Sequence, residues 1–343
     1  GLIYAPGMYA TPEEVRALVA AAAHAGVLYS THVRNEAEDL LSAIREAIDA
    51  AERSAARLEI SHLKAMGPRN HGSVVAALDL IDKARTRGVD VAADVYPYTA
   101  SSTSLVSRIP SWAQDGGKDA LLARLADPGT RRTIADQVAS RFGAGTDPDR
   151  LIIAEVPDSY DQSSVGRSLV ELGRADGTDP AEAALRLLES CEGNVTIVNH
   201  GMAEEDVTTV LRHPMVSVAS DGWIMTTEDP GRPHPRSFGT FARVLGRYVR
   251  ERNVLTLEEA VRKMTSLPAS RLGLTRRGVI GEGNAADIAV FDPDAVLDNA
   301  TFEEPRRLAT GCSAVFVNGV PAMLDGATTG LAGGGVIGSR GMR

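Results

Sequence analysis

Two hydrophobic patterns alternate along the first hundred residues of the chain. Short runs rich in β-branched residues predict strands, and the longer stretches between them carry apolar residues on one helical stripe. Elements of these lengths in alternation favour parallel strands joined by right-handed helical crossovers, so the predicted fold class is α/β. The predicted strands cover residues 27–32, 58–62 and 89–96, and the predicted helices cover residues 11–25, 37–56 and 74–87.

The alternation breaks between residues 99 and 202. This segment contains five prolines, a charged stretch that predicts one helix over residues 118–142, and two isolated apolar strands at residues 151–156 and 195–198. A stretch of this length without regular alternation is typical of an insertion. We therefore expect residues 1–98 to form strands and helices of a parallel layer, and residues 99–202 to form an inserted, lid-like subdomain.

The helix and strand pattern returns at residues 203–277. A helix is predicted at 204–212, a fourth strand at 216–222, and two further helices at 238–252 and 256–266, the last with Thr256 as N-cap and Glu259 in the capping-box position.

Residues 278–343 have a different texture of short strands and glycine turns. Strands are predicted at 278–283, 287–292 and 314–317, and the pair Asn318-Gly319 is a strong hairpin signal. We expect a small C-terminal β-domain of sandwich type followed by a glycine-rich tail. The glycines at 333–335 have no strand before them and no helix after them, so a phosphate-binding loop is disfavoured.

Composition narrows the class of protein. The chain has 343 residues, 43% of them apolar, with a net charge of −9 and two cysteines. The acidic balance argues against a nucleic-acid or anionic-membrane partner, so a small molecule is the expected ligand. Two cysteines are too few for a disulfide framework, and no apolar run reaches the roughly eighteen residues that span a bilayer. We expect a reduced, cytoplasmic setting, with any upstream targeting signal outside this sequence, which begins with glycine.

The residues that close the predicted strands suggest a metal site. His32, His62 and Asp221 each stand at a strand end. Parallel strands deliver their last residues to one rim, where imidazole and carboxylate groups can converge on one ion. The alternatives are a structural role for either histidine, which is the commoner fate of a single strand-end histidine, and a turn role for the aspartate, which precedes glycine.

Cations and a tyrosine stand near the same rim. Lys64 follows His62 by two residues, Arg236 closes the run Arg-Pro-His-Pro-Arg, and Tyr96 closes the third strand. Both cations suit a substrate carboxylate, and the tyrosine could donate a hydrogen bond to it. Surface charge and an aromatic plug are the alternatives. Of the other histidines, His24 and His213 stand at helix ends, and His71 and His200 have no assigned role.

One rival motif overlaps the best one. Ser61 and Lys64 match the S-x-x-K pattern of acyl-serine enzymes, in which the serine starts a buried helix. Here an apolar strand runs directly into Ser61, and no Lys-Thr-Gly element follows. We interpret the match as chance.

Several segments together resemble the N-acyl-D-amino-acid deacylases, or D-aminoacylases, of the amidohydrolase superfamily. The resemblance covers nearly the whole chain, and its motifs occur in the family's order. They are Thr-His-Val-Arg-Asn-Glu at 31–36, Ser-His-Leu-Lys at 61–64, Asp-Val-Tyr-Pro-Tyr at 94–98, Ser-Asp-Gly at 220–222, Arg-Pro-His-Pro-Arg at 232–236 with Gly-Thr-Phe at 239–241, Lys-Met-Thr at 263–265 and the run at 281–292.

The resemblance implies a site and a fold. In such enzymes zinc lies in a TIM-like (β/α) barrel, with ligands at the positions of His32 and His62 and a general base at the position of Asp221. The resemblance also implies which residues hold the substrate carboxylate and carbonyl: Lys64, Tyr96, Ser102 and Arg236. The four rim strands match strands five to eight, so the expected fold is a partial barrel, its second half.

The departures from the family are equally informative. Members of the family carry a His-x-His pair on the first barrel strand and a cysteine ligand, and this sequence has neither. We therefore expect the C-terminal portion of a longer enzyme, which alone lacks a ligand for tight zinc binding and turnover.

The expected function is zinc-dependent hydrolysis of the amide of an N-acyl-D-amino acid. The alternatives are a related amidohydrolase acting on a cyclic amide, such as a dihydroorotase or hydantoinase, and a non-catalytic member that has lost the metal. Acyl preference, side-chain preference and oligomeric state are not predicted.

Overall fold

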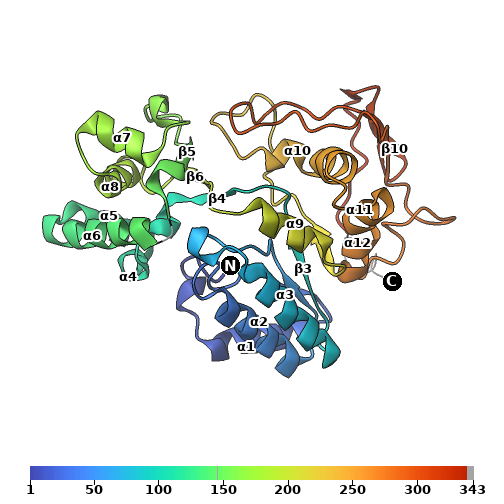
Figure 1. Cartoon of the computed structure of the whole chain (residues 1–343), viewed down its shortest axis with the longest axis horizontal. Helices are drawn as coiled ribbons and strands as arrows, with labels where there is room; N and C mark the ends of the chain where they lie inside the picture. Colours follow the sequence, from blue (N-terminus) through green and yellow to red (C-terminus); the bar gives the residue numbers. More distant parts are fainter. Residues whose placement is uncertain (145, 338–343) are drawn as a thin grey trace.

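The structure, a computed structural model, describes residues 1–144 and 146–337 (Figure 1). Three parts are visible: a parallel α/β layer, an inserted segment coloured green, and a C-terminal part coloured orange to red. Within the described residues, no helix combines the length and apolar character needed to cross a bilayer.

The parallel layer is a four-stranded sheet in the order β1-β2-β3-β7. Each of its strands coincides with a predicted one, and all pairs are parallel as the alternation predicted. The sheet is open, so the barrel itself stays a prediction. The strands are β1 (Tyr29–Thr31), β2 (Leu58–Ile60), β3 (Val91–Val95) and β7 (Val216–Val218).

Helices α2, α3 and α9 pack against strands of this sheet, beside β3 in Figure 1. The core between them is aliphatic and includes Ile44, Leu58, Val74 and Val91, each fully buried. Thr11 caps the first helix by accepting a hydrogen bond from the Glu14 amide, as its sequence predicted. The helices are α1 (Pro12–His24), α2 (Leu40–Ser54), α3 (Ser73–Thr86) and α9 (Glu204–Arg212).

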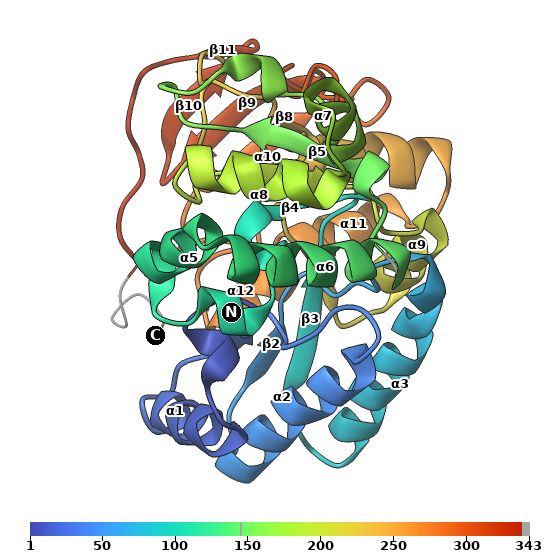
Figure 2. The ribbon, with the colours of Figure 1, turned by 90° about the vertical axis from the view of Figure 1, so that its left-hand side faces the viewer.

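The inserted segment builds an antiparallel sheet in the order β4-β6-β5, covered by helices (Figure 2). Its apolar side chains form a core of their own, separate from that of the parallel layer. The strands are β4 (Ser101–Ser104), β5 (Leu151–Glu155) and β6 (Thr196–Asn199), and the helices are α4 (Ser111–Gln114), α5 (Gly117–Ala126), α6 (Pro128–Ala144), α7 (Leu169–Asp176) and α8 (Pro180–Ser190).

One prediction for this segment is wrong. Residues 118–142 are two helices rather than one, because Pro128 cannot continue the hydrogen-bond ladder of α5 and starts α6 instead. The Asp127 carboxylate accepts a hydrogen bond from the Thr130 amide at 2.8 Å, which satisfies a donor at the new helix start.

The chain then continues through helices that pack beside β7. The predicted helix at 238–252 begins two residues earlier, at Arg236, and changes to π-helical geometry in its second half. Thr256 caps the next helix as predicted, accepting from the Glu259 amide at 3.2 Å. These elements are α10 (Arg236–Arg243), the π-helix η6 (Val244–Glu251), α11 (Leu257–Met264) and α12 (Ser266–Leu272).

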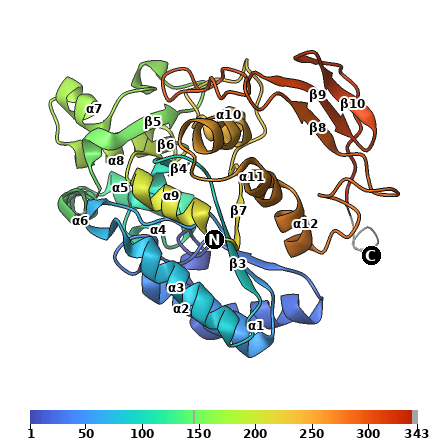
Figure 3. The same ribbon diagram turned by 45° about the vertical axis from the view of Figure 1, so that its right-hand side comes forward.

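The C-terminal part is an antiparallel sheet in the order β11-β10-β9-β8 (Figure 3). Asn318 and Gly319, both with positive φ, form the predicted hairpin turn between β9 and β10. Two expectations fail within the described residues: these strands form one sheet rather than a sandwich, and 278–283 is not a strand. The strands are β8 (Ile288–Phe291), β9 (Cys312–Val317), β10 (Val320–Leu324) and β11 (Ala327–Thr328).

Five single turns of 3-10 helix complete the elements. They are η1 (Gly7–Tyr9), η2 (Pro68–Asn70), η3 (Leu105–Arg108), η4 (Pro148–Arg150) and η5 (Gln162–Ser164).

Candidate metal centre and substrate cavity

Two histidines meet at the carboxyl ends of neighbouring strands. His32 directly follows β1, and His62 lies two residues beyond β2. Their ring centroids are 4.4 Å apart, with the rings nearly perpendicular. The sheet order explains the approach, because β1 and β2 pair in parallel and end at one rim.

A carboxylate completes this cluster. Glu36 Oε2 lies 3.4 Å from His32 Nε2, and Glu36 Oε1 lies 3.1 Å from His62 Nδ1. One ligand atom from each of the three residues lies within 4.8 Å of the others. His32 Nε2 is buried and makes no hydrogen bond of good geometry. Glu36 was not among the predicted ligands, although it closes the Thr-His-Val-Arg-Asn-Glu motif four residues after His32.

Lys64 contributes the cation of the cluster. Its Nζ lies 2.5 Å from Glu36 Oε1 and 2.7 Å from His62 Nδ1, and its side chain is buried. Burial alone would raise the pKa of Glu36, but the Lys64 ammonium and the two imidazoles outweigh it and hold that pKa well below its usual range. Burial lowers the pKa of Lys64, against the opposing pull of Glu36.

The backbone of His62 is held by Asp94. The His62 amide donates to Asp94 Oδ1 at 2.6 Å, and His62 has a φ of +41°, which is strained for a residue with a side chain. Burial raises the pKa of Asp94 to about 7, and the hydrogen bond from His62 opposes the rise. This bond from β3 holds the His62 backbone in its positive-φ conformation.

A second cluster surrounds the guanidinium of Arg236, the first residue of α10. The guanidinium carbon lies 4.7 Å from the ring centroid of Tyr96, and Nη1 lies 2.7 Å from Asp221 Oδ2. Nη2 donates a long hydrogen bond of 3.4 Å to the carbonyl of Ser102. Arg236 is thus a buried cation that joins the rim of β3, the segment after β7 and the inserted sheet.

The loop that carries Asp221 packs tightly on α10. Asp221 has a φ of +48°, and the next residue, Gly222, lies so close to Ser237 that a Cβ would come within 2.9 Å of its Cα. The Trp223 amide donates to Ser237 Oγ at 3.2 Å. Glycine is therefore required beside Asp221 for this close approach.

All seven predicted site residues line one cavity of about 1010 Å³. Arg108, at the end of η3, lines it too and was not predicted. Its Nε is enclosed without a hydrogen bond, and burial lowers its pKa. Within the described residues, Arg108 has no ion-pair partner, and its isolated position in the insertion gave no sequence signal. The predicted residues are His32, His62, Lys64, Tyr96, Ser102, Asp221 and Arg236.

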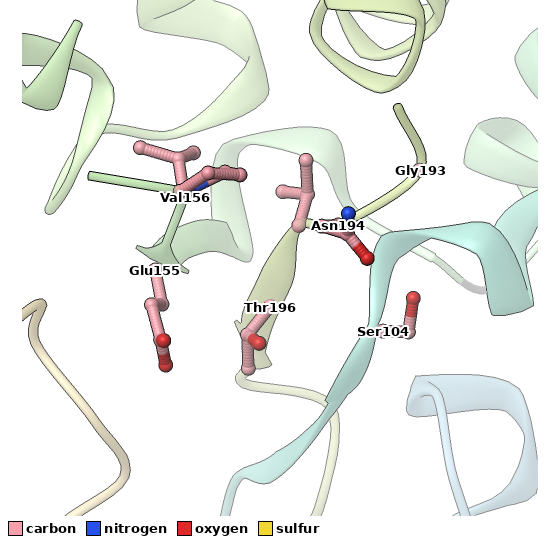
Figure 4. Close-up of a pocket in the computed structure, with 8 residues that line it drawn as sticks. Ser104, Glu155, Val156, Gly193, Asn194 and Thr196 are labelled. Carbon is pink, nitrogen blue, oxygen red and sulfur yellow. The ribbon is translucent and has the colours of Figure 1, made fainter. Parts of the chain in front are cut away.

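A smaller cavity of about 460 Å³ lies beside the inserted sheet (Figure 4). Ser104 and Thr196 line both cavities, so these two residues form a wall shared between them. Glu155 and Asn194 supply its remaining polar side chains.

The other histidines lie in different contacts. His200 packs against Phe302, with ring centroids 4.5 Å apart, and His71 contacts the Gly201 carbonyl at 3.1 Å. His213 contacts Asp82 at 3.0 Å. Ser61, the serine of the rival motif, shares a hydrogen bond with Ser30 at 2.9 Å and starts no helix, which agrees with a chance match.

Comparisons with known proteins identify the family of the chain. The model of the amidohydrolase family matches residues 4–323. An N-acyl-D-glutamate deacylase of Alcaligenes xylosoxydans xylosoxydans is 37% identical over 319 residues, which are 93% of this chain and 56% of that protein. A D-aminoacylase of the same organism is 35% identical over 337 residues, which are 98% of this chain and 60% of that protein.

A solved structure agrees in fold. The N-acyl-D-glutamate deacylase of Bordetella bronchiseptica, complexed with zinc and a phosphonate mimic of the tetrahedral intermediate, superposes with a TM-score of 0.77 at 34% identity. The match covers 96% of this chain and 60% of the other. The chain thus spans a little over half the length of the relatives it matches. The family model covers most of the sequence, and the chain belongs to the amidohydrolase family.

Proposed function

We propose that this chain carries the zinc and substrate sites of an enzyme that hydrolyses N-acyl-D-amino acids. The observation that carries the proposal is the meeting of two clusters in one cavity: His32, Glu36 and His62 on one side, and the Arg236 cation on the other. A free α-carboxylate and an amide carbonyl, the two polar groups of such a substrate, have one partner each.

The donor set fits zinc. Two imidazoles and a carboxylate are typical zinc ligands, and the buried His32 Nε2 already faces the Glu36 carboxylate at 3.4 Å. His32, Glu36 and His62 would hold the ion, which supplies Lewis acidity to polarise the scissile carbonyl. Asp94 would act behind His62 by holding the backbone from which its imidazole extends.

The remaining groups bind and move protons. Asp221 would accept a proton from the attacking water and return it to the leaving nitrogen, as a general base and then acid. Arg236 orients the Asp221 carboxylate through their 2.7 Å contact and would hold the substrate α-carboxylate with its planar fork. Lys64 and Tyr96 lie beside it, so the substrate would be anchored at one end while its carbonyl faces the histidines.

The cavity also favours an acidic substrate side chain. Arg108 lines it with an enclosed Nε that lacks a hydrogen bond and with no carboxylate partner among the described residues. The Arg108 side chain is partly buried and lines the cavity, so a second carboxylate on the substrate would find a cation to pair with there. The N-acyl-D-glutamate deacylase among the relatives acts on a substrate of this kind. N-acyl-D-glutamate is accordingly the preferred substrate class of the proposal.

Cyclic amides fit the site less well. A hydantoin or dihydropyrimidine ring has no free α-carboxylate, so Arg236 would lose the partner that its position suits. An open-chain substrate has both a carbonyl for the histidine cluster and an α-carboxylate for Arg236, so it is the better match.

The test compares ligand binding and turnover across three acyl amino acids. We expect the zinc-loaded full-length enzyme to act on N-acetyl-D-glutamate in preference to N-acetyl-D-leucine and N-acetyl-L-glutamate, with amine release as the assay. In that enzyme, Arg108→Gln should weaken the binding of N-acetyl-D-glutamate by about tenfold or more and leave the binding of N-acetyl-D-leucine nearly unchanged. Asp221→Asn should lower turnover by the full-length enzyme at least about a hundredfold at unchanged zinc content. Equal action on D- and L-substrates would refute the proposal.

A further inference from the structure

His234 stands between the substrate cluster and the inserted sheet. Its side chain is buried, with 3% of its surface exposed. Its Nε2 lies 2.9 Å from the carbonyl oxygen of Ala100, one residue before β4. Its Nδ1 lies 3.0 Å from the amide nitrogen of Arg236. His234 is the central residue of the Arg-Pro-His-Pro-Arg motif and had no predicted role.

These two contacts define the protonation of the ring. A carbonyl oxygen only accepts, so Nε2 must carry a hydrogen and donate it. A backbone N–H only donates, so Nδ1 must keep its lone pair. The ring is therefore the neutral Nε2–H tautomer. Burial and the nearby Arg236 charge lower the pKa of His234 well below its ordinary value, in agreement with this geometry.

Three aromatic side chains, two from the segment after β3 and one from the C-terminal part, surround the ring. The ring centroid of His234 lies 6.0 Å from that of Tyr96, 5.0 Å from that of Tyr98 and 5.1 Å from that of Phe302. Each contact is edge to face. The imidazole therefore has a fixed position from which to hold its two hydrogen bonds.

The bond to Arg236 satisfies the start of a helix. Pro235, at the N-cap of α10, offers no side-chain acceptor, and the first amides of a helix have no partner within it. His234 Nδ1 accepts from the first of them, that of Arg236. This bond fixes the backbone from which the Arg236 guanidinium extends to Asp221 and over Tyr96.

We propose that His234 is a positioning residue, whose neutral ring ties the Arg236 backbone to the Ala100 carbonyl and so sets the distance between the carboxylate anchor and the inserted sheet. The inference rests on the proposed function, in which Arg236 holds the substrate α-carboxylate. Ser102 lies two residues after Ala100, so the same tie places the Ser102 carbonyl beside the Arg236 guanidinium.

Three variants separate the two bonds. His234→Asn can place its amide oxygen where Nδ1 accepts, and it cannot reach Ala100. His234→Gln can place its amide nitrogen where Nε2 donates, and it loses the acceptor for Arg236. His234→Phe keeps the aromatic packing and removes both bonds. Arg236→Gln serves as the reference for complete loss of the carboxylate anchor.

The kcat/KM of the zinc-loaded full-length enzyme is measured for two probe substrates: N-acetyl-D-glutamate, and its analogue with an α-carboxamide in place of the α-carboxylate. We expect His234→Phe and His234→Gln to lower kcat/KM about tenfold for the first probe and less than twofold for the second, while His234→Asn recovers most of the loss. An equal loss for both probes would indicate a merely structural role, and no loss would also overturn the inference.

Two results keep this test separate from that of the proposed function. If Arg236→Gln does not change the ratio between the two probes, the proposed anchor fails. If Arg236→Gln changes the ratio and the His234 variants do not, only the positioning role fails. A ¹⁵N spectrum of the unmodified chain tests the geometry directly, with an Nε2–H tautomer that does not titrate between pH 5.5 and 8.5 as the expected result. A protonated or Nδ1–H ring would refute the inference even if a variant does not fold.

Discussion

Substitution of Arg271 by methionine should destabilise the parallel layer strongly. Arg271, on α12, donates through Nε to Glu59 Oε2 at 2.9 Å and through Nη2 to the Leu58 carbonyl at 2.6 Å. The side chains of Arg271 and Glu59 are only 8% and 9% exposed. Removing the arginine leaves a carboxylate buried on β2 without a cation, a change that typically costs about 3 to 5 kcal/mol.

Hydrogen exchange over β2 is the assay. Since 1.4 kcal/mol corresponds to a factor of ten, the peptide that covers Leu58–Ile60 should exchange about a hundredfold to several thousandfold faster in Arg271→Met. Arg53→Met is the matched control, because Arg53 and Asp49 make a contact of 2.7 Å between side chains that are 64% and 43% exposed. The control should cost at most about 0.5 kcal/mol.

The pH dependence and a double variant test the cause. Burial raises the pKa of Glu59, and Arg271 opposes the rise, so loss of Arg271 raises that pKa further. A carboxyl group whose pKa is raised in the folded state makes the protein more stable as the pH falls. The stability difference between wild type and Arg271→Met should therefore shrink from pH 8 toward pH 5. Adding Glu59→Leu should recover most of the loss. A deficit below about 1 kcal/mol, or one that the second substitution does not relieve, would refute the reasoning.

Three further predictions concern other buried or liganding groups. Burial lowers the pKa of Lys263 to about 8, although its ammonium donates to the Val216 carbonyl. The unfolded chain therefore binds more protons than the folded one between pH about 8 and 10.4, so the stability of the wild type should rise with pH in this range relative to Lys263→Met. Parallel pH profiles of the two proteins in urea unfolding would contradict this. Glu36→Gln should weaken zinc binding at least about tenfold in a chelator competition. Glu46, which pairs with Arg34 and is not one of the three clustered ligands, is the control: Glu46→Gln should leave zinc binding unchanged, and equal affinities of the two variants would remove Glu36 from the ligand set. In the full-length enzyme, Arg236→Lys should raise KM and lower kcat/KM for N-acyl-D-amino acids about tenfold or more, because an ammonium lacks the guanidinium fork; wild-type kinetics would show that the carboxylate is held elsewhere.

The rim of the sheet could be predicted because strand ends are visible in the sequence. His32, His62, Tyr96 and Asp221 each follow an apolar run, and parallel pairing alone brings such positions to one edge. The structure pairs β3 with β7 in parallel, although more than a hundred residues separate them.

Residues outside strand ends could not be found in this way. Glu36 lies in the irregular segment after β1, and its direction depends on the path of that loop. Arg108 comes from the insertion, whose packing follows its own core. His234 acts through backbone atoms of Ala100 and Arg236, and no pattern of side chains reveals such bonds. The C-terminal sandwich was wrong because alternation along short strands does not specify how many sheets they form.

The separate core of the inserted segment has a consequence for how specificity can change. The segment leaves after β3 and its chain returns to β7, the neighbouring strand, so both of its attachment points belong to adjacent strands of one layer. Its apolar side chains pack mainly on one another, so its sequence can drift without disturbing the sheet that holds the histidines. Ser102 and Arg108 belong to the inserted segment, whereas His32 and His62 belong to the parallel layer. Replacing the whole inserted segment by that of a relative would therefore change the pocket for the substrate side chain and leave the metal centre unchanged.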